Sequence, residues 1–157
     1  MTETQHPLPH PALVANLTDV RLRSISAEVC DGSGEPDKAS MQIGMRSEWD
    51  EDDHVLGFSL DYQVDLGADG STKLSVTASY LVTFVMARPF DGSPDTLAEF
   101  GTKVAAMAVH PYLREVVASL AARMGFEVKP LPLLRPSDLT AKEEPAPSEE
   151  LGPEPKQ

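Results

Sequence analysis

The chain has 157 residues, of which 41% are hydrophobic, which is enough for one domain with a buried core. Thirteen Lys and Arg residues stand against 25 Asp and Glu residues, for a formal net charge of -12. This balance argues against a cationic surface for nucleic acid or for an anionic membrane, and favours solubility and cationic partners.

The first 16 residues are polar and rich in proline, and we expect them to form a flexible N-terminal arm. They contain no apolar core of signal-peptide length, and no run in the chain approaches the roughly 18 apolar residues that span a bilayer. Cys30 is the only cysteine, which leaves neither an intrachain disulfide nor a thiolate zinc site. We therefore expect a cytoplasmic protein with no metal and no cofactor.

Apolar residues alternate with polar ones from residue 17 to residue 88, the period of β-strands. The first run, 20–29, changes phase between Leu22 and Ile25, which predicts a β-bulge. The second run covers 41–49, and acidic residues follow it. Both runs are weaker strand signals than the two that come next.

The runs 56–66 and 74–86 alternate regularly around a Gly-Ala-Asp-Gly turn at 67–70, which predicts a β-hairpin. The four strands are joined by loops short enough to connect antiparallel neighbours. We therefore expect a single four-stranded antiparallel sheet.

After residue 89 the apolar period becomes helical. Ser93 is a good N-cap, and Pro94 suits the first helical position. Pro111 lacks the amide that a continuing helix needs, so we predict a break at His110 and a second helix beyond it. Arg123 in the last turn and Gly125 just after it mark the end of that helix.

Strands followed by two helices predict an α+β fold with both helices on one face of the sheet. Residues 137–157 are acidic and proline-spaced, and lack the apolar surface needed to offset the entropy of ordering. We expect them to form a disordered tail, which leaves 17–136 as the folded domain.

Residues that could carry chemistry are scattered. His110 has no partner placed by the sequence, and Asp52, Asp53 and His54 are typical of a solvated loop. Cys30 lies beside Asp31, whose charge disfavours a reactive thiolate. An enzyme that uses His110 or Asp61 remains an alternative from a different functional class.

Apolar binding is the better-supported interpretation, because five methionines besides Met1 and nine aromatic residues accompany a small core. Methionine adapts to varied apolar partners. Trp49 and Phe90 flank irregular segments, where a groove is most plausible. The candidate groove residues are Met41, Met45, Trp49, Phe58, Tyr62, Tyr80, Phe84, Met86 and Phe90.

The order of these elements resembles the SecB family of protein-export chaperones. Residues 110–115 read His-Pro-Tyr-Leu-Arg-Glu, similar to the Pro-Tyr-x-Arg-Glu motif of the family. The stretches Arg-Met-Gly-Phe at 123–126 and Leu-Pro-Leu-Leu-Arg-Pro at 131–136 are similar to the turn and apolar stretch that follow it. Residues 17–22 look like the first strand of the family. The resemblance covers about residues 17–136.

The resemblance implies four strands, two helices and a homotetramer, a dimer of dimers built on the helices. It implies an ATP-independent holdase for unfolded or precursor polypeptides that keeps them soluble and competent for translocation, with SecA as a partner in export branches. The alternative is a dedicated chaperone of one partner, such as the antitoxin of a toxin–antitoxin system. The residues expected at the oligomer interface are Phe100, Val104, Met107, Tyr112, Val116 and Leu120.

Overall fold

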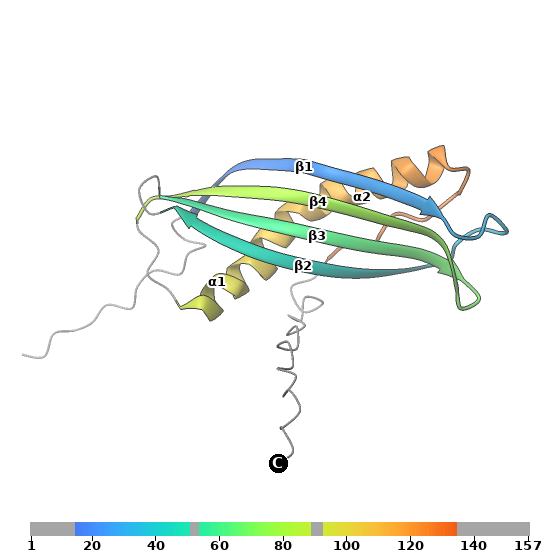
Figure 1. Ribbon diagram of the computed structural model, residues 1–157, viewed down its shortest axis with the longest axis horizontal. Helices are drawn as coiled ribbons and strands as arrows, with labels where there is room; N and C mark the ends of the chain where they lie inside the picture. The colour runs from blue at the N-terminus through green and yellow to red at the C-terminus, as the bar shows by residue number, and fades with distance from the viewer. Residues whose placement is uncertain (1–14, 51–53, 89–92, 135–157) are drawn as a thin grey trace, which may run out of the picture.

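The computed structural model describes residues 15–50, 54–88 and 93–134. One antiparallel sheet contains β1 (Ala15–Val29), β2 (Lys38–Asp50), β3 (Val55–Ala68) and β4 (Ser71–Met86). A helical segment follows, made of α1 (Pro94–Phe100), the π-helical turn η2 (Gly101–Ala105) and α2 (Ala106–Arg123). It crosses one face of the sheet diagonally, from β2 toward β1 (Figure 1). The expected α+β fold is confirmed.

The predicted arm and tail fall almost wholly outside the described residues. Only residues 15–16 of the arm are described, and they belong to β1. In the described ranges, no helix combines the length and the apolar character that crossing a bilayer requires.

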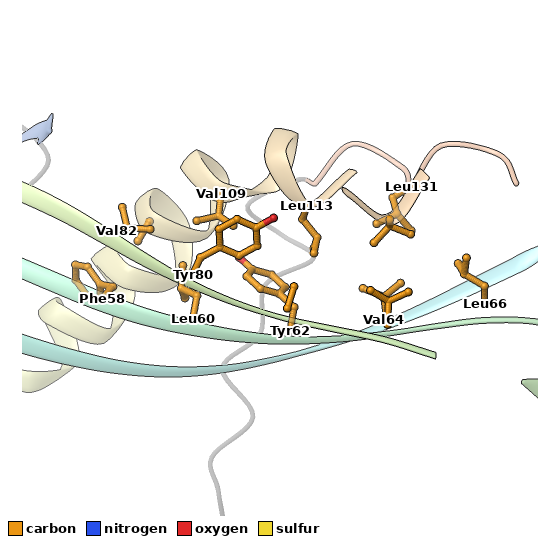
Figure 2. Close-up of a cluster of buried hydrophobic side chains, with 14 of the residues drawn as sticks. Phe58, Leu60, Tyr62, Val64, Leu66, Tyr80, Val82, Val109, Leu113 and Leu131 are labelled. Atoms are coloured by element: carbon orange, nitrogen blue, oxygen red, sulfur yellow. The ribbon is translucent and has the colours of Figure 1, made fainter. Parts of the chain in front are cut away.

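The β3–β4 hairpin forms as predicted, with a tighter turn. Asp69 and Gly70 both have positive φ, 53° and 76°, as a two-residue turn between twisted strands requires. The alternating apolar residues of both strands point to the helical side and are almost fully buried (Figure 2). This one face supplies most of the core.

β1 contains the predicted bulge and one more. Its register against β4 shifts between Leu22 and Ser24, as expected, and also between Leu17 and Asp19. Each shift skips one residue, so Leu17, Leu22 and Ile25 all lie opposite core-facing residues of β4. The bulges therefore keep one apolar face despite the broken alternation.

The strand order corrects one expectation. The first two strands were expected to be antiparallel neighbours, but the order is β1-β4-β3-β2, and β1 pairs with β4. The loop after β1 crosses the ends of β4 and β3, where Cys30 N–H donates to Lys73 O at 2.8 Å and Asp37 N–H to Gly67 O at 2.9 Å. Pairing of β1 with β4 covers both edges of the hairpin, which a local β1–β2 hairpin would not do.

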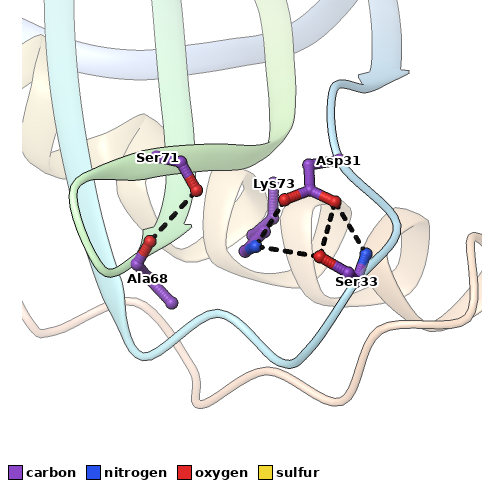
Figure 3. A network of polar contacts seen from close by, with 5 residues as sticks. All are labelled: Asp31, Ser33, Ala68, Ser71 and Lys73. Carbon is purple, nitrogen blue, oxygen red and sulfur yellow. Dashed lines mark hydrogen bonds and ion pairs between the residues drawn. The ribbon is translucent and has the colours of Figure 1, made fainter.

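A polar cluster holds that crossing loop in place (Figure 3). The Lys73 ammonium, nearly buried, donates to an Asp31 carboxylate oxygen at 2.6 Å. The other Asp31 oxygen accepts from the Ser33 N–H at 2.9 Å and its hydroxyl at 2.7 Å. Lys73 first, and then Ser33, hold the pKa of Asp31 well below its usual range. The carboxylate therefore stays charged and the loop stays tied to β4 across the neutral pH range.

The predicted break at His110, before Pro111, is wrong. α2 runs from Ala106 through Pro111 to Arg123 without interruption. Pro111 lies on the exposed side of the helix, where water can bond to the Met107 carbonyl that the missing amide leaves unpaired. Burial of the opposite side against the sheet outweighs the lost bond. The irregularity occurs ten residues earlier, at η2.

The predicted start of the helical segment at Ser93 and its predicted end at Gly125 are confirmed. The Ser93 hydroxyl caps α1 by accepting from the Thr96 N–H at 3.2 Å. At the far end Gly125 has φ 86°, Phe126 N–H donates to Ala121 O at 2.9 Å, and Gly125 N–H donates to Ala122 O at 3.1 Å. This pair of bonds is the Schellman ending that a glycine after the last turn permits.

The π-helical turn begins at Gly101, which packs tightly against side chains of the sheet. A Cβ on Gly101 would lie 2.6 Å and 2.8 Å from two ring carbons of Phe58, and would also collide with the sulfur of Met45. The φ of Gly101 is helical, so any residue could adopt its backbone conformation. Glycine is needed at this position because a larger residue would collide with Phe58 and Met45.

We expect Gly101→Ala to lower the free energy of unfolding, measured by urea denaturation. Overpacking costs about 1–3 kcal/mol, against which the better helix propensity of alanine returns at most about 1 kcal/mol. The control is Gly57→Ala, whose new Cβ meets nothing closer than 3.9 Å. In a Phe58→Leu background, with a smaller side chain below, the Gly101→Ala cost should shrink or change sign. An equal cost in both backgrounds would contradict the proposed collision with Phe58.

Candidate binding surface

The helix leaves the two outer strands only partly covered, because it crosses the sheet on a diagonal (Figure 1). Two apolar rows result on the helical side. We call Met41, Ile43, Met45 and Trp49 the β2 flank, and Leu17, Leu22, Ile25 and Val29 the β1 flank. The β2 flank is half-buried against the core, whereas the side chains of the β1 flank are 40–50% exposed.

The candidate groove residues do not all meet on one open surface. Met41, Met45 and Trp49 lie together on the β2 flank, with the Trp49 ring stacked on His54 at a centroid distance of 6.4 Å. Five others are at most 3% exposed and form the core beneath the helix: Phe58, Tyr62, Tyr80, Phe84 and Met86. Phe90 lies outside the described residues. Among the candidate groove residues that the structure describes, Met41, Met45 and Trp49 are therefore the ones accessible to a partner in the single chain.

Two of the buried candidates carry hydroxyl groups without a partner. Neither the Tyr62 nor the Tyr80 hydroxyl has a hydrogen-bond partner in the described part of the chain. Burial raises the pKa of both, and the Glu115 carboxylate raises the pKa of Tyr80 further. Both phenols therefore stay protonated, and neither is placed for proton transfer to an external group.

The residues expected at the oligomer interface divide in a similar way. Phe100 is 1% exposed and belongs to the core, and Val104 is half-buried against it. Tyr112, Val116 and Leu120 are spaced by four residues and so form one stripe along α2. The Tyr112 side chain is 53% exposed, and the other two are half-buried. Met107 is 37% exposed but lies on the opposite side of the helix from this stripe.

The stripe lies next to the β1 flank. α2 contacts both β4 and β1. His110 and Arg114, on the other side of α2 from the stripe, bond to the carbonyls of Leu131 and Pro132, so the Tyr112 stripe is turned toward β1. The Tyr112 stripe and the β1 flank together make an apolar surface, of which the sequence predicted only the stripe. The β1-flank residues were missed because alternation alone does not tell which strand the helix leaves uncovered.

The chain that returns after α2, residues 126–134, we call the C-terminal strap. It has no regular secondary structure and packs across the end of the sheet that the helix leaves open (Figure 1). Phe126 and Leu131 are buried in the core cluster. The Arg114 Nε donates to Leu131 O at 2.7 Å, and His110 Nε2 to Pro132 O at 2.8 Å. His110 therefore has the structural use that the sequence favoured, with a partner that the sequence did not identify.

The residues considered for chemistry do not converge. Asp61 lies on the polar outer face of the sheet, where it accepts from Ser79 and pairs with Arg46 at 3.5 Å, whereas His110 lies on the helical side. Asp61 lines a shallow hollow of about 330 Å³ that draws polar residues from all four strands. Among the described residues no three His, Cys, Asp or Glu side chains are grouped to hold a metal ion. Asp52 and Asp53 lie outside those residues.

Comparison with known proteins identifies the fold. The sequence matches no protein-family model and no curated protein. The structure is similar to the Rv1957 SecB-like chaperone of Mycobacterium tuberculosis, solved in complex with a ChAD peptide from the Rv1956 HigA1 antitoxin. The TM-score is 0.68 at 16% identity, over 80% of this chain and 94% of that one. A protein of unknown function from Streptococcus agalactiae matches at a TM-score of 0.39 and 10% identity, over 77% and 96% of the two chains. The chain has the SecB-like fold expected from its sequence.

Proposed function

We propose that this protein is an ATP-independent chaperone, a holdase that binds unfolded or precursor polypeptides and keeps them soluble and competent for translocation. The likeness to a SecB-like chaperone that was solved with a bound peptide carries the proposal. The apolar flanks of the sheet support it, because a chaperone needs apolar surface that a single folded chain leaves accessible.

The β2 flank is the proposed client-binding surface. Met41, Met45 and Trp49 present flexible and flat apolar side chains along one edge strand, which suits clients of varied sequence. Burial of such surface contributes about 25 cal/mol per Å², from which the cost of ordering the client is subtracted. The net charge of -12 favours clients with basic flanks and speeds their capture.

The narrower alternative is a dedicated chaperone for the antitoxin of a toxin–antitoxin pair. The antitoxin peptide bound to the similar chaperone favours this candidate. The two candidates differ in selectivity. A general holdase protects unrelated unfolded proteins, whereas a dedicated one protects its antitoxin at equimolar concentration and leaves the others to aggregate.

Self-association is the second part of the proposal. The β1 flank and the Tyr112 stripe are the surface through which we expect chains to pair, leading to a dimer of dimers. A cytoplasmic protein of this kind has two further candidate partners, the SecA motor for export and the antitoxin for the narrower role. Copurification of this protein with SecA and with the antitoxin, each in high and in low salt, shows which of the two is a partner.

The direct test measures aggregation of a chemically unfolded client after dilution, by light scattering, with and without the purified full chain and without ATP. We expect the wild type to suppress scattering in proportion to its concentration. Met41→Ser should weaken client binding by about fivefold, since the lost apolar contact is worth about 1 kcal/mol. The neighbouring Gln42→Ser is the control, because Gln42 lies on the outer face of the same strand.

Trp49, the single tryptophan, gives a second measurement on the unmodified protein, since its fluorescence should change when a tryptophan-free client binds the β2 flank. Failure of the wild type to slow the aggregation of any client, its antitoxin included, would refute the chaperone proposal.

A further inference from the structure

The C-terminal strap is bound in the way that an extended apolar peptide would be bound. It leaves α2 through the Schellman turn and has no regular structure of its own. Its apolar residues are Phe126, Val128, Leu131, Leu133 and Leu134, and its prolines are Pro130 and Pro132. Only Phe126 and Leu131 are buried, and Leu133 is 72% exposed. The strap therefore adheres to the domain through a few contacts.

In the second half of the strap, the polar contacts run from side chains of α2 to main-chain carbonyls of the strap. Arg114 and His110, one helical turn apart on α2, donate to the consecutive carbonyls of Leu131 and Pro132 at 2.7 Å and 2.8 Å. Every peptide offers such carbonyls, including one with proline, so these two donors do not select a sequence. Because the Nδ1 atom of His110 has no partner in the described residues, this bond is the one that its ring makes there.

The apolar part of the contact in the second half of the strap is the buried position of a single side chain, Leu131. Leu131 belongs to the same core cluster as Val64, Leu66 and Leu113, and Figure 2 draws it between the helix and β3. The two donors lie beside that place, so the site accepts an extended segment with one aliphatic side chain inserted and its carbonyls turned toward α2. A buried aliphatic side chain contributes about 1.5–3 kcal/mol to such a contact.

A tie near the start of the strap completes the arrangement. The Glu127 N–H donates to the Glu35 carboxylate at 2.7 Å, in the loop that crosses from β1 to β2. This bond and the turn at Gly125 hold the strap close to its site even when Leu131 leaves it. A tethered segment of this kind competes at an effective concentration in the millimolar range.

We propose that Arg114, His110 and the apolar place of Leu131 form a binding site for an extended apolar peptide, which the strap of the chain itself occupies in the free protein. A client segment enters by displacing the strap. The entry of a client segment rests on the proposed holdase function, whereas the existence of the peptide-binding site does not. The strap thereby holds an apolar site closed until a client is present.

The site itself is tested with a fluorescent synthetic peptide that has the sequence of residues 126–136, added to the full chain. Leu131→Ser weakens the strap of the chain itself, and we expect the peptide to bind this variant at least tenfold more tightly than the wild type. Leu133→Ser is the matched control, since it makes the same change at an exposed position of the strap and should behave as the wild type. Adding Arg114→Ala to Leu131→Ser should weaken peptide binding about tenfold again.

Equal peptide affinity for the wild type and a folded Leu131→Ser variant would overturn the site. Hydrogen exchange on the unmodified protein provides a measurement that does not depend on the variant folding. Amides 127–134, prolines apart, should exchange faster than those of α2, and faster still when the 126–136 peptide is added in excess. Unchanged exchange with excess peptide would equally overturn the site.

Displacement by clients is tested separately with a permanently unfolded, carboxymethylated polypeptide. If the strap competes, Leu131→Ser binds this client severalfold more tightly than the wild type and Leu133→Ser do. Equal client affinities of the three proteins would show that the strap does not compete with clients, even if the 126–136 peptide binds. A wild type that binds no client refutes the proposed function while the peptide result still decides the site.

Discussion

Phe100→Ala is expected to lower the free energy of unfolding by about 3–5 kcal/mol, the usual cost of removing a buried aromatic side chain. Phe100 is 1% exposed, and its ring centroid lies 5.0 Å from that of Phe84 and 5.7 Å from that of Phe58. It joins the start of the helix to the sheet. Truncation leaves a cavity next to Gly101, where the helix packs tightly against Phe58.

Urea denaturation followed by circular dichroism measures this cost. Met107→Ala, seven residues further along the helix at an exposed position, is the control and should change the unfolding free energy by well under half as much. The result also separates two roles for Phe100. If Phe100→Ala changes the mass in solution and leaves the unfolding free energy of the chain unaltered, Phe100 belongs to an interface between chains and not to the core.

Ile25→Asp is expected to break the proposed oligomer and leave the chain folded. Ile25 is 40% exposed at the centre of the β1 flank, so a charge there is tolerated in the monomer. Once a second chain covers the flank, the same charge must be desolvated without a partner. We expect a rise in the dissociation constant of roughly 100-fold or more, which corresponds to about 3 kcal/mol.

Light scattering coupled to size-exclusion chromatography gives the mass directly. The control is Ser26→Asp, which adds the same charge one residue away on the outer face of β1. It should keep the mass of the wild type, which we expect near four chains. An Ile25→Asp variant that retains the full mass would show that the β1 flank is not where the chains pair.

The local elements of the fold followed from local chemistry. The hairpin formed because alternation over 56–66 and 74–86 leaves one apolar face, whose burial drives pairing in a single register. Ser93 and Gly125 ended the helical segment as predicted, because caps depend on backbone groups only a few residues away. The bulge after Leu22 was likewise visible as a change of phase.

The candidate site was predicted less well. Met41, Met45 and Trp49 lie at the accessible edge, while Phe58, Tyr62 and Phe84 have the same apolar character and fill the core. Both groups consist of apolar residues on strands, so residue type alone could not tell the accessible group from the buried one. Their difference comes from the position of the helix, which covers β3 and β4 and leaves parts of β1 and β2 uncovered.

From its residues alone the chain is specified as four strands and a helical segment, with caps, a turn and one bulge, because each depends on neighbours in the sequence. The tertiary structure decided three other features. β1 pairs with β4, although β2 is nearer in sequence, because burial of both hairpin edges outweighs the local connection. α2 continues through Pro111 because packing on the sheet offsets one lost backbone bond. The strap packs beside α2 because Arg114 and His110 donate hydrogen bonds to carbonyls 17 and 22 residues away in the sequence. Such contacts join residues distant in sequence, so their energies depend on the arrangement of the whole chain.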